Sequence, residues 1–141
     1  MGVSIKPPLV CAMLGAALPA HADKMSLSDA PIHQPIVLNC DFVTECYEAE
    51  PCQDTRFSVT LEGQASGFED VNLLVDVRMR SEAADVPLMG NRSNGALALA
   101  GSVDGGRHMV TTNADGTARF TVHDADGPMM VSYLGSCAPQ P

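Results

Sequence analysis

The chain lacks tryptophan and has few other aromatic residues, since Phe, Trp and Tyr together make up 4% of its 141 residues. Basic residues are also scarce, because Lys and Arg number 8 against 17 Asp and Glu, and the formal net charge is −9. A strongly acidic protein repels phosphate backbones and anionic lipid headgroups, so the composition argues against nucleic acid and membrane surfaces as partners. The same charge favours basic proteins and keeps a small exported domain in solution.

Signatures of catalysis are absent as well. The sequence contains no Gly-x-Ser-x-Gly, no His-Glu-x-x-His, no phosphate-binding loop and no dinucleotide-binding glycine pattern. It has no Cys-x-x-Cys pair, and its cysteines and histidines do not have the spacing of a zinc site. We therefore expect a protein that is not an enzyme and that uses no cofactor.

The first recognisable segment is a secretory signal peptide, predicted over residues 1–22. Lys6 is its only charged residue, residues 7–19 form an apolar run, and residues 20–22 read Ala-His-Ala, a small-x-small cleavage site. The apolar run is too short to span a bilayer and no later segment is long enough, so we expect no membrane insertion after cleavage. Cleavage would remove Cys11 and leave an even number of cysteines in a periplasmic or secreted protein, where disulfides form.

The remaining cysteines, Cys40, Cys46, Cys52 and Cys137, allow three pairings. A bond between Cys40 and Cys46 is disfavoured, because six extended residues span roughly 20 Å whereas a disulfide needs Cα atoms within about 7 Å. We expect Cys46–Cys52 to close a short loop that contains Pro51. Cys40–Cys137 would then tie the first strand to the last.

The hydropathy pattern of the chain after the signal peptide is that of β-strands. Phe57, Val59 and Leu61 alternate with polar residues, and residues 71–79 place Leu73, Val75, Val77 and Met79 on one face. Gly, Asp and Asn recur between such short runs.

These signals predict an all-β fold, a single antiparallel meander of about seven or eight strands forming a small barrel or a sandwich and stapled by disulfides. We expect this β domain over residues 35–137. Residues 23–34 are polar and contain Pro31, so they are predicted to be a mobile N-terminal arm, and residues 138–141 a short tail.

The last hairpins have the clearest turn signal. Residues 113–116 read Asn-Ala-Asp-Gly, and a four-residue turn would place Thr112 opposite Thr117. In that register Met109 opposes Phe120, and both are expected to face the core.

The same register places His108 and His123 diagonally across the other face of the hairpin. Diagonal neighbours lie roughly 7–8 Å apart, so the two imidazoles are candidates for a shared metal. The chain has 8 methionines, and Met with His in an exported protein suggests copper(I), which prefers soft ligands. The alternative is that methionine fills a core that is short of aromatic residues.

Acidic residues crowd the cysteine loop, where Glu45, Glu48 and Glu50 lie within the segment 45–52 that also holds Cys46 and Cys52. They are candidates for contacts with a basic partner or for a weak calcium site. The alternative interpretation is a solvated loop held by a disulfide.

The segment 38–52, with its Cys-x5-Cys-x5-Cys spacing, and the segment 133–137, which ends in Cys137, resemble small exported proteobacterial proteins of uncharacterised function. The resemblance implies a periplasmic or secreted location and says nothing of activity. In size, location and disulfide use the chain is also similar to small periplasmic β-barrel lysozyme inhibitors, although it lacks their Ser/Gly/Lys inhibitory loop motif.

Together these features predict an exported, non-enzymatic binding or structural protein of the cell envelope, an inhibitor or docking module for a basic protein. A periplasmic carrier of copper or of a small ligand is the alternative, and an enzyme of unrecognised type is a further one.

Overall fold

A computed structural model describes residues 2, 27–127 and 129–140 of the chain. Apart from Gly2, the predicted signal peptide with Cys11 lies outside the described residues, as do residues 23–26 of the predicted arm. Across the described part of the chain, no helix has the length and apolar character needed to cross a membrane.

The described chain consists almost entirely of β-strands. A short 3-10 helix, η1, precedes them at Leu27–Asp29. The strands are β1 (Ile32–Tyr47), β2 (Gln53–Glu69), β3 (Asn72–Arg80), β4 (Asp85–Ser93), β5 (Ala96–Val103), β6 (Gly106–Thr112), β7 (Thr117–Asp124) and β8 (Met129–Pro139).

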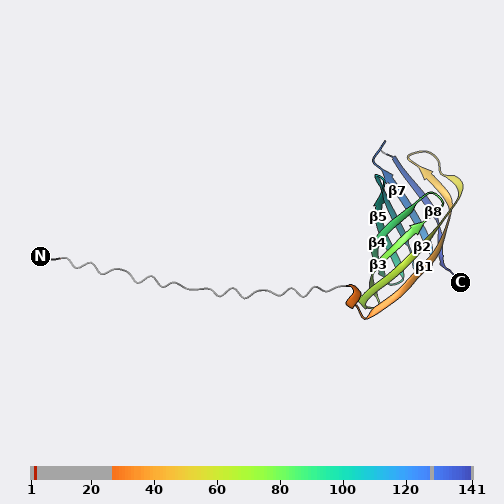
Figure 1. Cartoon of the computed structure of the whole chain (residues 1–141). Coiled ribbons are helices and arrows are strands. Elements are labelled where there is room, and N and C mark those ends of the chain that lie inside the picture. Colours follow the sequence, from red (N-terminus) through yellow and green to blue (C-terminus); the bar gives the residue numbers. More distant parts are fainter. Residues whose placement is uncertain (1, 3–26, 128, 141) are drawn as a thin grey trace.

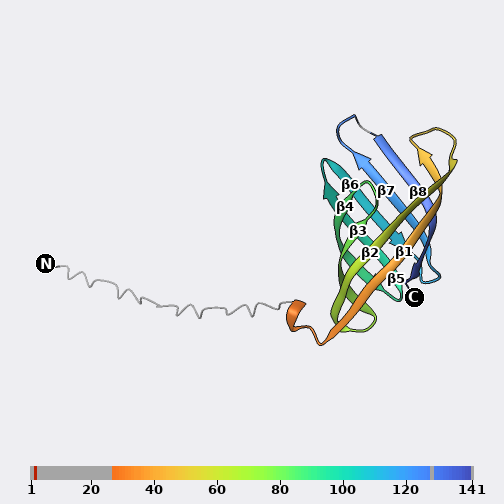
Figure 2. The same ribbon diagram turned by 45° about the vertical axis from the view of Figure 1, so that its right-hand side comes forward.

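The eight strands form a closed barrel in chain order (Figures 1 and 2). Each strand pairs antiparallel with the next, and β8 returns to pair antiparallel with β1. This confirms the predicted all-β meander and shows that it is a barrel of eight strands. Because β1 and β8 pair with each other, the sheet has no free edge strand where the barrel is closed. A barrel of eight strands is also narrow enough for side chains to fill its interior.

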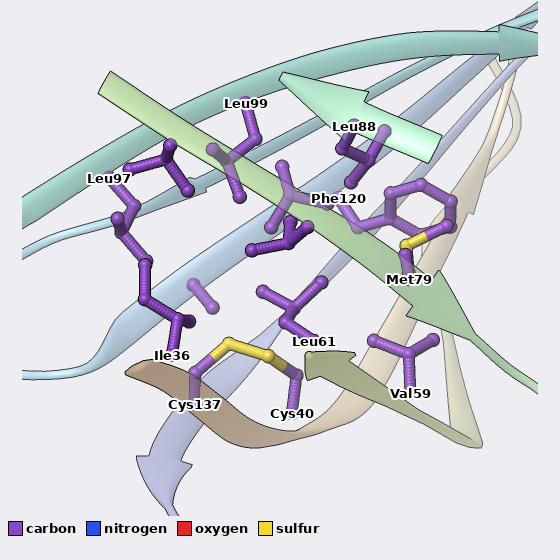
Figure 3. Packing of buried hydrophobic residues seen from close by; sticks show 14 of the residues in the cluster. Ile36, Cys40, Val59, Leu61, Met79, Leu88, Leu97, Leu99, Phe120 and Cys137 are labelled. Atoms are coloured by element: carbon purple, nitrogen blue, oxygen red, sulfur yellow. A yellow bond between two sulfur atoms is a disulfide. The ribbon is translucent and has the colours of Figure 1, made fainter. Parts of the chain in front are cut away.

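The interior is packed mostly with aliphatic side chains, to which strands β1 to β7 contribute, and β8 adds Cys137 and the partly buried Tyr133. Figure 3 shows part of this cluster. The predicted inward face of β3 is confirmed, because Leu73, Val75, Val77 and Met79 are all at most 2% exposed. Among the described residues, Phe42 and Phe120 are the only buried aromatic residues of this cluster, and Phe57 and Tyr133 pack against it partly buried. The few aromatic residues therefore leave most of the core volume to Val, Leu and Met.

Both predicted disulfides are confirmed. Cys40 and Cys137 face each other across the β1–β8 pair that closes the barrel, with a Cα–Cα distance of 3.9 Å, and both lie in the core (Figure 3). Cys46 and Cys52 flank the loop between β1 and β2, with a Cα–Cα distance of 4.2 Å. One disulfide therefore fastens the seam of the barrel and the other fixes a loop at its rim.

Two inward-facing glycines allow neighbouring strands to approach closely. A Cβ atom at Gly90 on β4 would overlap the carbonyl oxygen of Ala98, and one at Gly101 on β5 would overlap that of Pro87. Glycine at such positions lets strands bend sharply enough to close a small barrel.

The β domain is longer at both ends than the sequence predicted. β1 begins at Ile32, so residues 32–34 belong to the strand and not to a mobile arm, and β8 runs to Pro139, into the predicted tail. Pro35 obscured the start of β1, because proline cannot donate to a strand ladder. The structure tolerates it because β8 pairs with β1 only from Leu38 onward, which leaves the preceding part of β1 without a neighbour on that side.

The predicted register of the β6–β7 hairpin is wrong by one residue. The Asn113 N–H donates to the Thr117 carbonyl at 2.9 Å, and Gly116 has a positive φ of 89°, so the loop contains three residues and not four. A three-residue loop of this kind is a type I turn followed by a left-handed residue. Val110 therefore opposes Phe120, and Met109 points outward and is 53% exposed.

The two-residue turns on either side of β5 differ from that loop. Asn94 and Gly95 both have positive φ, and so do Asp104 and Gly105. Positive φ at both central positions is the type I′ geometry, which matches the twist of paired strands. The dipeptide Asp-Gly thus does not specify the loop length, because it occurs in both kinds of loop. Asp104 and Gly105 both adopt positive φ, whereas of Asp115 and Gly116 only the glycine does.

Candidate functional site

One end of the barrel carries an acidic residue in every loop. This end, called the acidic end below, comprises the four loops β1–β2, β3–β4, β5–β6 and β7–β8, which stand away from η1 in Figures 1 and 2. The carboxylates in these loops are Glu48, Glu50, Glu82, Asp104 and Asp126. The sequence between these strand ends holds no Lys or Arg.

The loop carboxylates also have no cationic partner among the residues that the structure describes. Among the described residues the ion pairs join Arg78 and Arg80 to Asp85, and Arg80 to Glu62, all on the outer faces of strands β2 to β4. The arginines closest to the acidic end on β3 are thus already neutralised, whereas none of the loop carboxylates makes an ion pair with a described residue. Arg107, the second residue of β6, is an exposed cation beside this end, so the five loop carboxylates give it an excess of negative charge. Such an excess creates a field that attracts a cationic surface.

The cysteine loop is fixed firmly to its neighbour. Glu48 has a positive φ of 49°, its N–H donates to the Met130 carbonyl at 3.0 Å, and its Oε1 accepts a hydrogen bond from the Met130 N–H at 2.6 Å. The Glu50 N–H donates to the Tyr47 carbonyl at 3.0 Å. Together with the Cys46–Cys52 disulfide, these bonds hold the loop against the start of β8. Glu48 thus fastens the loop, and Glu50 stands on its exposed turn.

Glu45 occupies a different environment from the other two glutamates. The pairing of β1 shifts between Phe42 and Thr44, a bulge around Val43, and the shift places Glu45 opposite Tyr133. Tyr133 also pairs with the inward-facing Phe120, so Glu45 lies at the inner rim of the barrel and is partly buried. The three predicted partner-binding glutamates therefore do not form one surface patch.

Tyr133 is a residue that sequence reasoning did not identify. Its pKa is raised to about 12, first because burial disfavours the phenolate, and then because the hydrogen bond and the negative charge of Glu45 favour the neutral hydroxyl. A bulge leaves no pattern in a single sequence, and the inward orientation of Glu45 that creates this pair depends on the bulge.

Aromatic rings fill the interior behind Glu45. The ring centroids of Phe57 and Tyr133 are 4.9 Å apart, and those of Phe120 and Tyr133 are 5.5 Å apart. His108 stacks on Phe120 at 5.9 Å, and within the described part of the chain its buried Nδ1 has no hydrogen-bond partner. Burial accordingly lowers the pKa of His108.

The structure separates the two histidines that were candidates for a shared metal. His108 opposes Val122 and points into the barrel, while His123 opposes Arg107 and points outward. The cause is the three-residue loop, because a one-residue change of register moves side chains to the opposite face. In the described ranges no three His, Cys, Asp or Glu residues gather into a metal-binding group.

The methionines divide between the core and the surface. Met79 is buried, while Met89 is 61% and Met109 is 53% exposed, both on outer faces. Met79 therefore fills core volume, as the alternative interpretation of the methionines expected.

No protein-family model, curated protein or solved structure matches this chain. The two disulfides indicate an oxidising environment outside the cytoplasm.

Proposed function

We propose that this protein is an exported, non-enzymatic binding protein that docks its acidic end onto a basic protein of the cell envelope. The observation that carries the proposal is that every loop at this end bears a carboxylate without a cationic partner among the described residues. A periplasmic or secreted location agrees with the predicted signal peptide, with the disulfides and with the resemblance of the cysteine segments to exported proteins.

The rigidity of the acidic end supports docking rather than a mere solvated loop. The Cys46–Cys52 disulfide and both hydrogen bonds between Glu48 and Met130 hold the cysteine loop in one position. A loop that is already ordered loses little conformational entropy when it binds, so more of the interaction energy appears as affinity. Unpaired charges around it accelerate the encounter with an oppositely charged surface.

The partner class is tested first with lysozyme, because the chain is similar in architecture to small periplasmic lysozyme inhibitors. Since the inhibitory Ser/Gly/Lys loop motif is missing, any contact here would be made through the acidic loops. Binding is measured by biolayer interferometry and inhibition by the rate at which lysozyme clears a cell-wall suspension. Raising the salt concentration should weaken the complex, because exposed charges are screened beyond about 8 Å at physiological ionic strength.

The broader test compares proteins captured from the host's own envelope extract. The double variant Glu50→Gln/Asp104→Asn removes two charges from the acidic end, and the matched control Glu69→Gln/Asp70→Asn removes two exposed charges from the β2–β3 turn at the other end. We expect basic proteins to be captured by the wild type and by the control, and to be lost with the acidic-end variant. Equal capture by all three proteins, or no basic protein with the wild type, would contradict the proposal.

A further inference from the structure

A cavity lies at the end of the barrel opposite the acidic end. It forms where the β1–β8 pairing ends at Leu38 and Pro139, while β1 continues to Ile32 with β2 as its only paired neighbour. The cavity has a volume of about 470 Å³ and is open to solvent. This volume is within the range of pockets that hold small molecules, roughly 300–1,000 Å³.

The inner wall of the cavity is apolar. Ile36, Leu38 and Leu97 line it from β1 and β5, and Figure 3 shows Ile36 and Leu97 on the same side of the buried cluster as Cys137. The Cys40–Cys137 disulfide and the neighbouring core hold this wall in place. A ligand that enters the mouth therefore meets a preformed hydrocarbon surface.

Arg92 brings a positive charge into the same cavity. It continues the inward face of β4 after Val86 and Leu88, and its Nη2 donates a hydrogen bond to Oε1 of Gln34 on β1. The guanidinium makes no ion pair with any described residue, although the chain carries a net charge of −9. A partly buried cation without a counter-ion is costly, and a bound anion would supply the missing charge.

The other polar groups at the mouth limit the charge of that anion. Asp115 lines the cavity from the β6–β7 loop, and its Oδ1 accepts a hydrogen bond from the Thr117 N–H at 2.9 Å. This bond favours the ionised carboxylate and lowers the pKa of Asp115. Asp115 makes no ion pair with Arg92 among the described residues, so the guanidinium can still take one carboxylate. The negative charge of Asp115 at the same mouth repels a second negative charge, so a monoanion fits better than a dianionic phosphate.

We infer that this cavity binds a small amphiphilic carboxylate, with its carboxylate on Arg92 and its apolar part against Ile36, Leu38 and Leu97. The guanidinium is planar and presents paired N–H donors that match the two oxygens of a carboxylate. The inference is independent of the docking proposed for the acidic end, because the two sites lie at opposite ends of the barrel and share no residue.

The test is an NMR titration of the isotopically labelled protein with octanoate below its micelle concentration. Shifts should concentrate on the methyl groups of Ile36, Leu38 and Leu97 and on the Arg92 side chain. Arg92→Gln should weaken binding by at least about ten-fold, since a hydrogen bond to a charged group is lost. The control Arg119→Gln, at an exposed site on the outer face of β7 near the same end, should leave binding unchanged.

Two further ligands test the charge requirement on the wild-type protein, so the result does not depend on the folding of a variant. Octanol, which has no charge, and octyl phosphate, which carries more than one, should both bind more weakly than octanoate. Equal binding of octanol, shifts outside the cavity, or no shifts at millimolar octanoate would overturn the inference.

Discussion

Removal of the Cys40–Cys137 disulfide should cost much more stability than removal of Cys46–Cys52. The first bond joins residues separated by 97 positions and the second joins residues separated by 6. In the chain-entropy treatment, a cross-link stabilises the fold by restricting the unfolded chain, and the effect grows with the logarithm of loop length. The expected values are about 4.7 kcal/mol for the long loop and about 2 kcal/mol for the short one.

The structure adds to this difference. Cys40 is fully buried and Cys137 is 8% exposed, so Cys40→Ala/Cys137→Ala also removes packed sulfur atoms from the core. Cys46 and Cys52 lie at the rim, where Cys46→Ala/Cys52→Ala leaves little empty space. The β1–β8 hydrogen bonds remain in both variants, so we expect both to fold, with the seam variant much less stable.

Urea denaturation of the wild type and the two double variants measures these free energies. The seam variant should also show a larger dependence of stability on urea, because its unfolded chain expands and exposes more surface. The reasoning is refuted if the rim variant loses as much stability as the seam variant. An unchanged urea dependence in the seam variant would likewise show that the bond does not act through the unfolded chain.

Three further perturbations test the packing of the barrel. Gly90→Ala should lower the free energy of unfolding in urea by about 3 kcal/mol or more, because its Cβ would overlap a neighbouring carbonyl. Gly105→Ala only strains a residue with positive φ and should lower it by about 1 kcal/mol. Equal losses in the two variants would argue against the close approach of β4 and β5. A Tyr47→Phe variant leaves Tyr133 as the sole tyrosine, and its ultraviolet absorbance should show ionisation with a pKa of about 12. The stability of this variant should fall as the pH rises from 10 towards 12, because the unfolded chain releases its phenolic proton first. Ionisation near pH 10 in the folded protein would contradict this. Burial lowers the pKa of His108, so the unfolded chain binds a proton at a higher pH than the folded protein does. Stability should therefore fall as the pH drops from 6.5 through the lowered pKa. His108→Leu should abolish this part of the acid dependence in thermal unfolding curves.

The strands were predictable because they depend on a local pattern. The alternation of apolar and polar residues around Val75 and Val77 directs one face of β3 toward the core, so the inward residues follow from the sequence. The short reach of a disulfide disfavoured only Cys40–Cys46, which has the same separation as Cys46–Cys52. The bond Cys46–Cys52 was preferred because Pro51 was expected to turn the segment between these two residues.

The register of β6 and β7 was not predictable by the same means. Loops of three and four residues both accommodate Asp115-Gly116, and the choice between them reverses the faces of His108 and Met109. The bulge at Val43 has the same effect on Glu45, which lies at the inner rim beside Tyr133 instead of on the acidic surface. Both errors arise from a shift of a single residue.

The sequence by itself determined the strand-rich class of this protein and its acidity, because these depend on the period of two and on composition. It favoured one pairing of the cysteines, which the structure confirms. Only the tertiary structure decided that the meander closes as a barrel, that unpaired carboxylates gather at one end and that Arg92 faces a cavity at the other. Closure brings residues from distant strands to the same rim, and those neighbours are set by register and strand order, which no local pattern encodes.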